Sequence, residues 1–102
     1  MAVGHRPCSE GLAEAGVALK DGAVAVNERL ETTLDGVYAV GDVVGRYMLA
    51  HVASYQGIVA AENALAPRGS GRQADYGAVP TCVYTLPEIA AVGLSEEEAR
   101  AQ

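Results

Sequence analysis

Tryptophan and phenylalanine are absent from this 102-residue sequence, which leaves five tyrosines as its large aromatic residues. Half of the residues are hydrophobic, and many of these are Ala and Val. A chain of this length has material for one domain with a modest core. We therefore expect elements that pack backbone against backbone, with few large side chains between them.

Positive charge is also scarce. Seven Lys and Arg residues face 13 Asp and Glu residues, which gives a net charge of −6 and a pI near 4.7. This acidic balance argues against a nucleic-acid partner and against binding to an anionic membrane. No run approaches the roughly 20 apolar residues that cross a bilayer. Residues 1–7 lack the apolar run of a signal peptide, so we expect no membrane association and no secretion.

The two cysteines, Cys8 and Cys82, lie far apart in unlike surroundings. No Cys-x-x-Cys pair and no His/Cys cluster is present, so we expect neither a disulfide framework nor a metal site. Unpaired thiols are typical of a reducing, cytoplasmic setting. Cys82 follows Thr81 and precedes Val83 in a β-prone stretch, and we expect it to be a small core residue. A Gly-x-Gly-x-x-Gly phosphate loop is also missing.

Several local signals divide the sequence into short elements. Asp21-Gly22 predicts a reverse turn, and the alanine-rich stretch from Met48 to Leu65 predicts one helix. Ser95 with Glu98 forms a capping box that predicts a helix start. We further predict strands at Ala23–Val26, Val37–Val40, Thr81–Thr85 and Ile89–Val92, and the end of a strand at Ala2–Gly4. Pro67–Arg72 is predicted to be a linker. The residues of the helix that we expect to face the core are Leu49, Val52, Ala53, Val59 and Ala60. The fold class is α/β, or α+β for a chain of this size.

The most informative stretch runs from Thr32 to Asp42. It reads as a threonine, a four-residue turn, a short apolar strand and then Gly41-Asp42. A lone Asp after a strand commonly caps a helix or forms a turn. Here the predicted helix opens six residues later, and a helix N-terminus offers unpaired N–H groups and partial positive charge. A carboxylate beside it is typical of a site for a polar, partly anionic ligand.

This stretch resembles the second flavin-binding fingerprint of the FAD/NAD-linked disulfide oxidoreductases. Within them, Met48-Leu49-Ala50-His51, then Gly57 and Ala60-Ala61-Glu62, are similar to the dihydrolipoamide dehydrogenase family. Residues 80–93 resemble the entry into that family's dimerisation domain. The resemblance runs nearly end to end. It implies the last part of a Rossmann-like FAD-binding domain in residues 1–71 and the first strands of the interface domain in residues 72–102.

The resemblance also assigns cofactor contacts. The Asp at the position of Asp42 binds a ribityl hydroxyl of FAD, with Gly41 allowing close approach. Met48, Leu49, Ala50 and His51 line the flavin, and His51 is a flavin-lining residue instead of the catalytic base. Gly4 matches a glycine that can touch NAD. His5 replaces the usual Arg after that glycine, and Cys8 stands where Asn is common.

The activity implied is oxidation of dihydrolipoamide with NAD, through FAD and a redox disulfide. Neither the cysteine pair nor the His-Glu base of the family occurs in this sequence, so no residue here is assigned a catalytic role and we expect an inactive part of a larger parent. The parent is expected to be a homodimer that takes a lipoyl substrate and docks on the acyltransferase of 2-oxo-acid dehydrogenase complexes. Alternatives are a mercuric reductase or soluble transhydrogenase type, a non-catalytic flavin-binding module, and a plain acidic interaction domain.

Overall fold

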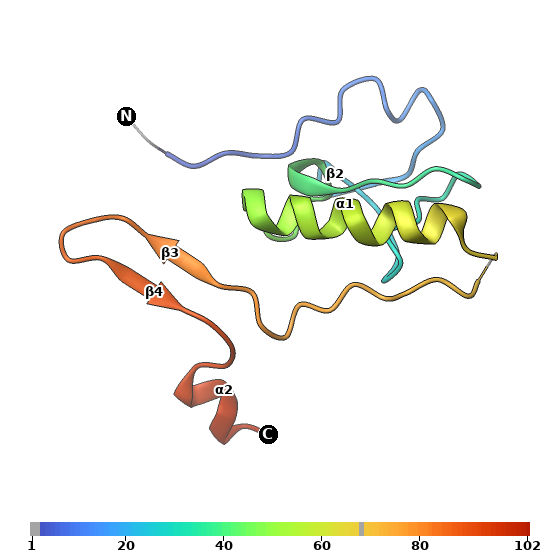
Figure 1. Cartoon of the computed structure of the whole chain (residues 1–102). Helices are drawn as coiled ribbons and strands as arrows, with labels where there is room; N and C mark the ends of the chain where they lie inside the picture. The colour runs from blue at the N-terminus through green and yellow to red at the C-terminus, as the bar shows by residue number, and fades with distance from the viewer. Residues whose placement is uncertain (1–2, 68) are drawn as a thin grey trace.

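The computed structural model describes residues 3–67 and 69–102 and places one long helix, α1 (Ala50–Leu65), at the centre of the chain (Figure 1). Two short antiparallel hairpins and two shorter helical segments are the other regular elements within these residues. They are β1 (Leu19–Lys20) with β2 (Ala23–Val24), β3 (Thr81–Val83) with β4 (Ile89–Ala91), the 3-10 helix η1 (Gly41–Val44), and α2 (Glu96–Arg100). Helices with antiparallel strands make this an α+β arrangement, in agreement with the predicted fold class.

The first hairpin follows directly from its turn residues. Leu19 pairs with Val24 and Lys20 with Ala23 across Asp21-Gly22. Both turn residues have positive φ, 53° and 81°, which matches the right-handed twist of the flanking strands. The predicted reverse turn is confirmed, while the strand predicted over Ala23–Val26 is shorter than expected.

The core is small and lies along one face of α1. Leu30, Val59 and Ala60 form a buried cluster, packed by Val26, Tyr38, Val40, Tyr55 and Ala74. Val52 of the predicted stripe is buried as expected, but so are two polar residues of the same face, Gln56 and Asn63. The buried stripe is therefore partly polar, which a count of apolar residues does not reveal.

The predicted strand over Val37–Val40 is wrong in extent. Only one isolated bridge forms, between Glu31 and Tyr38, with Ala39 N–H donating to Leu30 O at 3.1 Å. Leu30 has a φ of 66°, a left-handed conformation that turns the partner segment away. The ladder therefore stops after a single bridge.

Helix α1 begins two residues later than predicted, at Ala50 instead of Met48. Leu49 is extended, with φ −129° and ψ 132°, and Tyr47 has a φ of 122°. These conformations exclude Met48 and Leu49 from the helix. At the other edge, Val3 and Gly4 form no strand, Ala2 lies outside the described residues, and so does Arg68 of the predicted linker.

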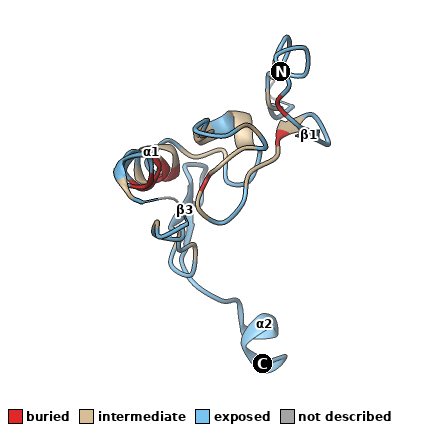
Figure 2. Ribbon diagram, turned by 90° about the vertical axis from the view of Figure 1, so that its right-hand side faces the viewer, coloured by how far each residue is buried: buried red, intermediate tan, exposed pale blue. Residues whose placement is uncertain are grey.

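The second hairpin and α2 extend away from the body that surrounds α1 (Figures 1 and 2). Residues 80–102 are all exposed. The capping box at α2 is confirmed, because Glu98 N–H donates to Ser95 Oγ and Ser95 N–H donates to Glu98 Oε2. The prediction that Cys82 is a core residue is wrong: Cys82 and Cys8 are both free and exposed, since β3 packs only against β4 among the described elements.

Candidate cofactor-binding site

Gly41 fixes the turn that carries Asp42 against α1. Its φ is 77°, and a Cβ at this position would lie 3.3 Å from the Ala53 Cβ. Its N–H donates to Gln56 Oε1 at 2.6 Å. Both the backbone conformation and the close approach to the helix require glycine here. Asp42 follows as the second residue of η1 and is exposed.

The chain then returns to α1 through a tight loop. Gly45 has a φ of 74° and donates its N–H to Asp42 O at 3.0 Å, and Leu49 N–H donates to Tyr47 O at 2.7 Å. Leu49, the N-cap of α1, makes no side-chain capping bond. The N–H groups of the first helical turn have no partner within the helix, and the helix dipole makes this end electropositive.

The predicted site residues fall on two neighbouring elements, and their role in binding a cofactor stays a prediction. Gly41 and Asp42 lie on η1, which packs against α1. Met48 and Leu49 are half-buried in the loop, and Ala50 and His51 open the helix as exposed residues. Gly4 is exposed with a φ of 92°, and nothing lies within 4 Å of the position its Cβ would take. A role for Gly4 in binding NAD stays a prediction.

His51 connects the start of α1 to the second hairpin. Its Nε2 lies 2.9 Å from the carbonyl oxygen of Pro80, the residue before β3. This hydrogen bond lies where the chain passes from α1 and the segments packed on it to the second hairpin. The segment that leads into β3 is thus attached to the same helical turn as the candidate site.

The sequence interpretation missed two residues, Gln56 and Tyr76, whose side chains contact the segments that form the candidate site. Gln56 is 1% exposed, and its Nε2 donates to the Tyr76 hydroxyl at 2.9 Å. The Tyr76 ring stacks on Tyr47 with ring centroids 5.2 Å apart, and the guanidinium carbon of Arg46 lies 4.3 Å from the Tyr76 centroid. The available signal was the place of Gln56 four residues after Val52, on the buried face of the helix.

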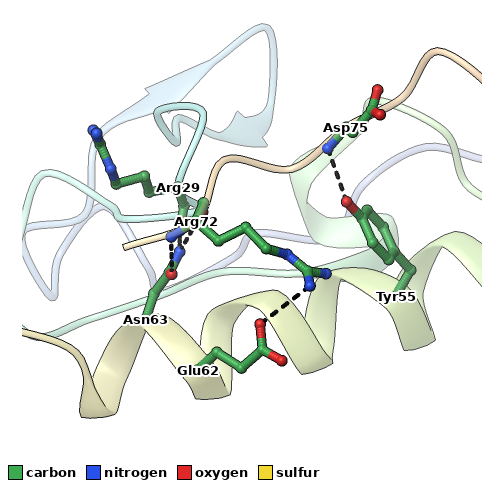
Figure 3. Close-up of polar contacts among 6 residues, drawn as sticks. All are labelled: Arg29, Tyr55, Glu62, Asn63, Arg72 and Asp75. Carbon is green, nitrogen blue, oxygen red and sulfur yellow. Dashed lines mark hydrogen bonds and ion pairs between the residues drawn. The ribbon is translucent and has the colours of Figure 1, made fainter. Parts of the chain in front are cut away.

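A second buried amide holds the segment that carries Tyr76 along α1 (Figure 3). Asn63 Oδ1 accepts from Arg72 N–H at 2.7 Å, and its Nδ2 donates to the carbonyl oxygens of Arg29 and Arg72 at 2.9 Å each. Asp75 N–H donates to the Tyr55 hydroxyl at 2.8 Å. We call residues 71–77 the strap. Its backbone is fixed by side chains of α1 at Arg72 and at Asp75.

Two grooves flank this arrangement. The larger, of about 1110 Å³, lies between residues 23–29, 44–47 and 73–77. The smaller, of about 450 Å³, is lined by residues 31–36 and by the end of α1. Neither groove is lined by Asp42 or by residues 48–51. The candidate site is therefore an open surface at the edge of the larger groove, which it meets at Val44–Tyr47.

Within 3–67 and 69–102, no three His, Cys, Asp or Glu residues are grouped so that they could hold a metal ion. No helix in these ranges has the length and apolar character needed to span a membrane.

Comparisons with known proteins agree with one another on the family. The family model described as "Pyridine nucleotide-disulphide oxidoreductase" matches residues 1–57. The chain is 52% identical to a dihydrolipoyl dehydrogenase of Thermus scotoductus, covering 98% of the chain and 22% of that protein. It is 46% identical to the enzyme of the same name from Chlamydia pneumoniae, covering 92% of the chain and 20% of that protein.

Solved structures give the same picture. The HOCl-induced flavoprotein disulfide reductase RclA from Escherichia coli superposes with a TM-score of 0.82 at 31% identity, covering 99% of the chain and 24% of that structure. The chain thus spans about a fifth of the length of the relatives it matches.

Proposed function

The chain belongs to the pyridine nucleotide-disulphide oxidoreductase family, and from this we propose that it forms the flavin-holding part of a dihydrolipoyl dehydrogenase. Such an enzyme oxidises dihydrolipoamide with NAD, through FAD and a redox disulfide. The names of the Thermus and Chlamydia relatives support this choice within the family. The thiol chemistry and the acid–base step would be carried by residues outside this sequence.

One observation carries the proposal: Gly41 is bonded to Gln56 and packed on Ala53, so that η1, which presents the exposed Asp42, lies against α1. The residues present fit FAD. The exposed carboxylate of Asp42 can accept a hydrogen bond from a hydroxyl of the ribityl chain. The unpaired N–H groups of α1 favour negative charge on a ligand placed above them. Bound there, the flavin would pass two electrons between a thiol pair and NAD.

The remaining assignments follow the same proposal. Met48, Leu49, Ala50 and His51 would line the flavin, and Gly4 would touch NAD. Because Met48 and Leu49 precede the helix, they would approach the ligand from an extended loop. Binding through backbone atoms would tolerate apolar side chains at these positions.

We further propose that residues 72–102 begin an interface domain of a homodimer. The second hairpin exposes large apolar side chains, among them Tyr84 and Leu86, which is 99% exposed. Such surface is normally covered in an assembled protein. The partners proposed for the parent are a second copy of itself and the acyltransferase of a 2-oxo-acid dehydrogenase complex, in the cytoplasm.

The test is to express the complete protein in which residues 1–102 occur and to measure its flavin content and its reduction of NAD by dihydrolipoamide. A yellow protein with one FAD per chain and dihydrolipoamide-dependent NADH formation is expected. A colourless protein would exclude the flavin site. A yellow protein that ignores dihydrolipoamide would favour the second candidate, a disulfide reductase of another specificity, which the likeness to RclA supports.

A further inference from the structure

Gln56 can adopt only one amide orientation in this structure. The Gly41 N–H can only donate, so the oxygen of the amide must face it. The amide nitrogen is thereby directed at the Tyr76 hydroxyl, which accepts at 2.9 Å. Because Gln56 is buried, an amide that turned away from either partner would leave a polar group without a hydrogen bond. The Gly41 N–H therefore selects the orientation of the amide, and the Tyr76 hydroxyl satisfies the buried amide nitrogen and holds the side chain in place.

Tyr76 also contacts the loop on the other side of Asp42. Its ring stacks on Tyr47, whose φ of 122° is rare for a residue with a side chain. Such a conformation persists only where surrounding contacts hold it. The stack, together with Arg46 over the same ring, supplies contacts of this kind. One side chain thus supports both the turn before Asp42 and the loop that leads into Met48.

The position of Tyr76 is itself set by the strap. Asn63 fixes the Arg72 backbone, and Tyr55 fixes the Asp75 N–H, one residue before Tyr76. The chain that follows is bound at Pro80 by His51. Tyr76 therefore links the strap, by hydrogen bonds and ring contacts, to the segments that form the candidate site.

We propose that Tyr76 is a positioning residue of this site: through Gln56 it orients the Gly41 N–H and so the Gly41-Asp42 turn, and through Tyr47 it supports the entry to α1. The inference rests on the proposed function only for the identity of the ligand, FAD. Residues 72–102 would then do more than form an interface, because removal of the Tyr76 hydroxyl would loosen the Gly41-Asp42 turn.

The experiment follows the amide proton of Gly41 by NMR in the full 102-residue chain. In Tyr76→Phe, we expect an upfield shift of this proton and hydrogen exchange about fivefold faster, the effect of one weakened hydrogen bond. Gln56→Leu should produce the same change. In the double variant, Tyr76→Phe should add nothing, because its effect passes through Gln56. Gln56→Glu should preserve the protection, since a carboxylate can accept from both the Gly41 N–H and the Tyr76 hydroxyl.

The matched control is Tyr84→Phe, which removes a tyrosine hydroxyl from the exposed loop of the second hairpin, away from Gln56 and the strap. It should leave the Gly41 proton unchanged. An unchanged Gly41 proton in Tyr76→Phe, additive effects in the double variant, or a random-coil Gly41 shift in the unmodified chain would overturn the inference. FAD content of the complete protein is measured separately: a protein without flavin would overturn the proposed function and leave the coupling of Gly41 to Tyr76 in place.

Discussion

Asn63 and Arg72 are joined by a pair of hydrogen bonds between one side-chain amide and one backbone residue. Arg72 N–H donates to Asn63 Oδ1 at 2.7 Å, and Asn63 Nδ2 donates to Arg72 O at 2.9 Å. The amide thus imitates the edge of a neighbouring β-strand. A side chain of α1 takes the part that a sheet partner would play, and this attaches the strap to the helix without a strand.

Gly71 must stay without a side chain for this pairing to form. A Cβ at Gly71 would lie 2.5 Å from Asn63 Oδ1, and the bonded, buried amide has no room to move. We expect Gly71→Ala to lower the free energy of unfolding by about 1–3 kcal/mol, as overpacking does, measured by urea denaturation.

The matched control is Gly57→Ala in the interior of α1, where nothing lies within 4 Å of the added Cβ. It should raise the free energy of unfolding by about 0.5–1 kcal/mol, because alanine favours the helix. If Gly71→Ala left the free energy of unfolding unchanged or raised it, the packing described for Gly71 would be wrong.

Removal of the Asp42 carboxylate should weaken flavin binding in the complete protein. A hydrogen bond to a charged group contributes about 1.5–3 kcal/mol, so Asp42→Ala should raise the dissociation constant of FAD about 10- to 100-fold. Titration of the apoprotein with FAD, followed by flavin fluorescence, measures the change. Asp21→Asn removes the same charge in the first hairpin and preserves its turn, so it should leave the affinity for FAD unaltered.

The isolated 102-residue chain should hold FAD weakly or not at all. Asp42 is exposed, and neither groove is lined by Asp42 or by residues 48–51, so a ligand would be covered on one side only. Ligand sites normally bury most of the ligand's surface. Gel filtration after incubation with FAD should give a colourless protein peak. A yellow peak with stoichiometric flavin would contradict this prediction.

Acid should weaken the capping box at the start of α2. The backbone N–H and the hydroxyl of Ser95 hold the pKa of Glu98 below its ordinary value. A carboxyl group with a lowered pKa in the folded state stabilises that state above its unfolded pKa, and the contribution is lost as the pH falls through the folded value. The Ser95 amide proton should therefore shift on acidification as Glu98 protonates, as NMR can record. In Ser95→Ala the pKa of Glu98 should rise towards its ordinary value.

Motifs of a few neighbouring residues predicted a turn, a helix and a helix cap correctly. The Asp21-Gly22 turn, the alanine-rich helix and the Ser95–Glu98 capping box each depend on residues within four positions of one another, and all three are present. The fingerprint ending at Asp42 is also a short motif with fixed spacing, and the cofactor contacts that it predicts stay predictions.

Contacts between distant residues decided what the sequence interpretation missed. The start of α1 depends on the conformation of Tyr47, which is stacked on Tyr76 from the strap. The length of the strand at Val37–Val40 depends on Leu30, and the exposure of Cys82 depends on what covers β3. Gln56 and Asn63 look like solvent-facing polar residues until their partners, 15 and 9 residues away, are known.

The bond between His51 and Pro80 settles the protonation of one ring nitrogen. A carbonyl oxygen has no proton to give, so Nε2 of His51 must carry one. In the neutral imidazole, Nδ1 is then the ring nitrogen with a free lone pair, so the ring can accept a hydrogen bond only through that atom.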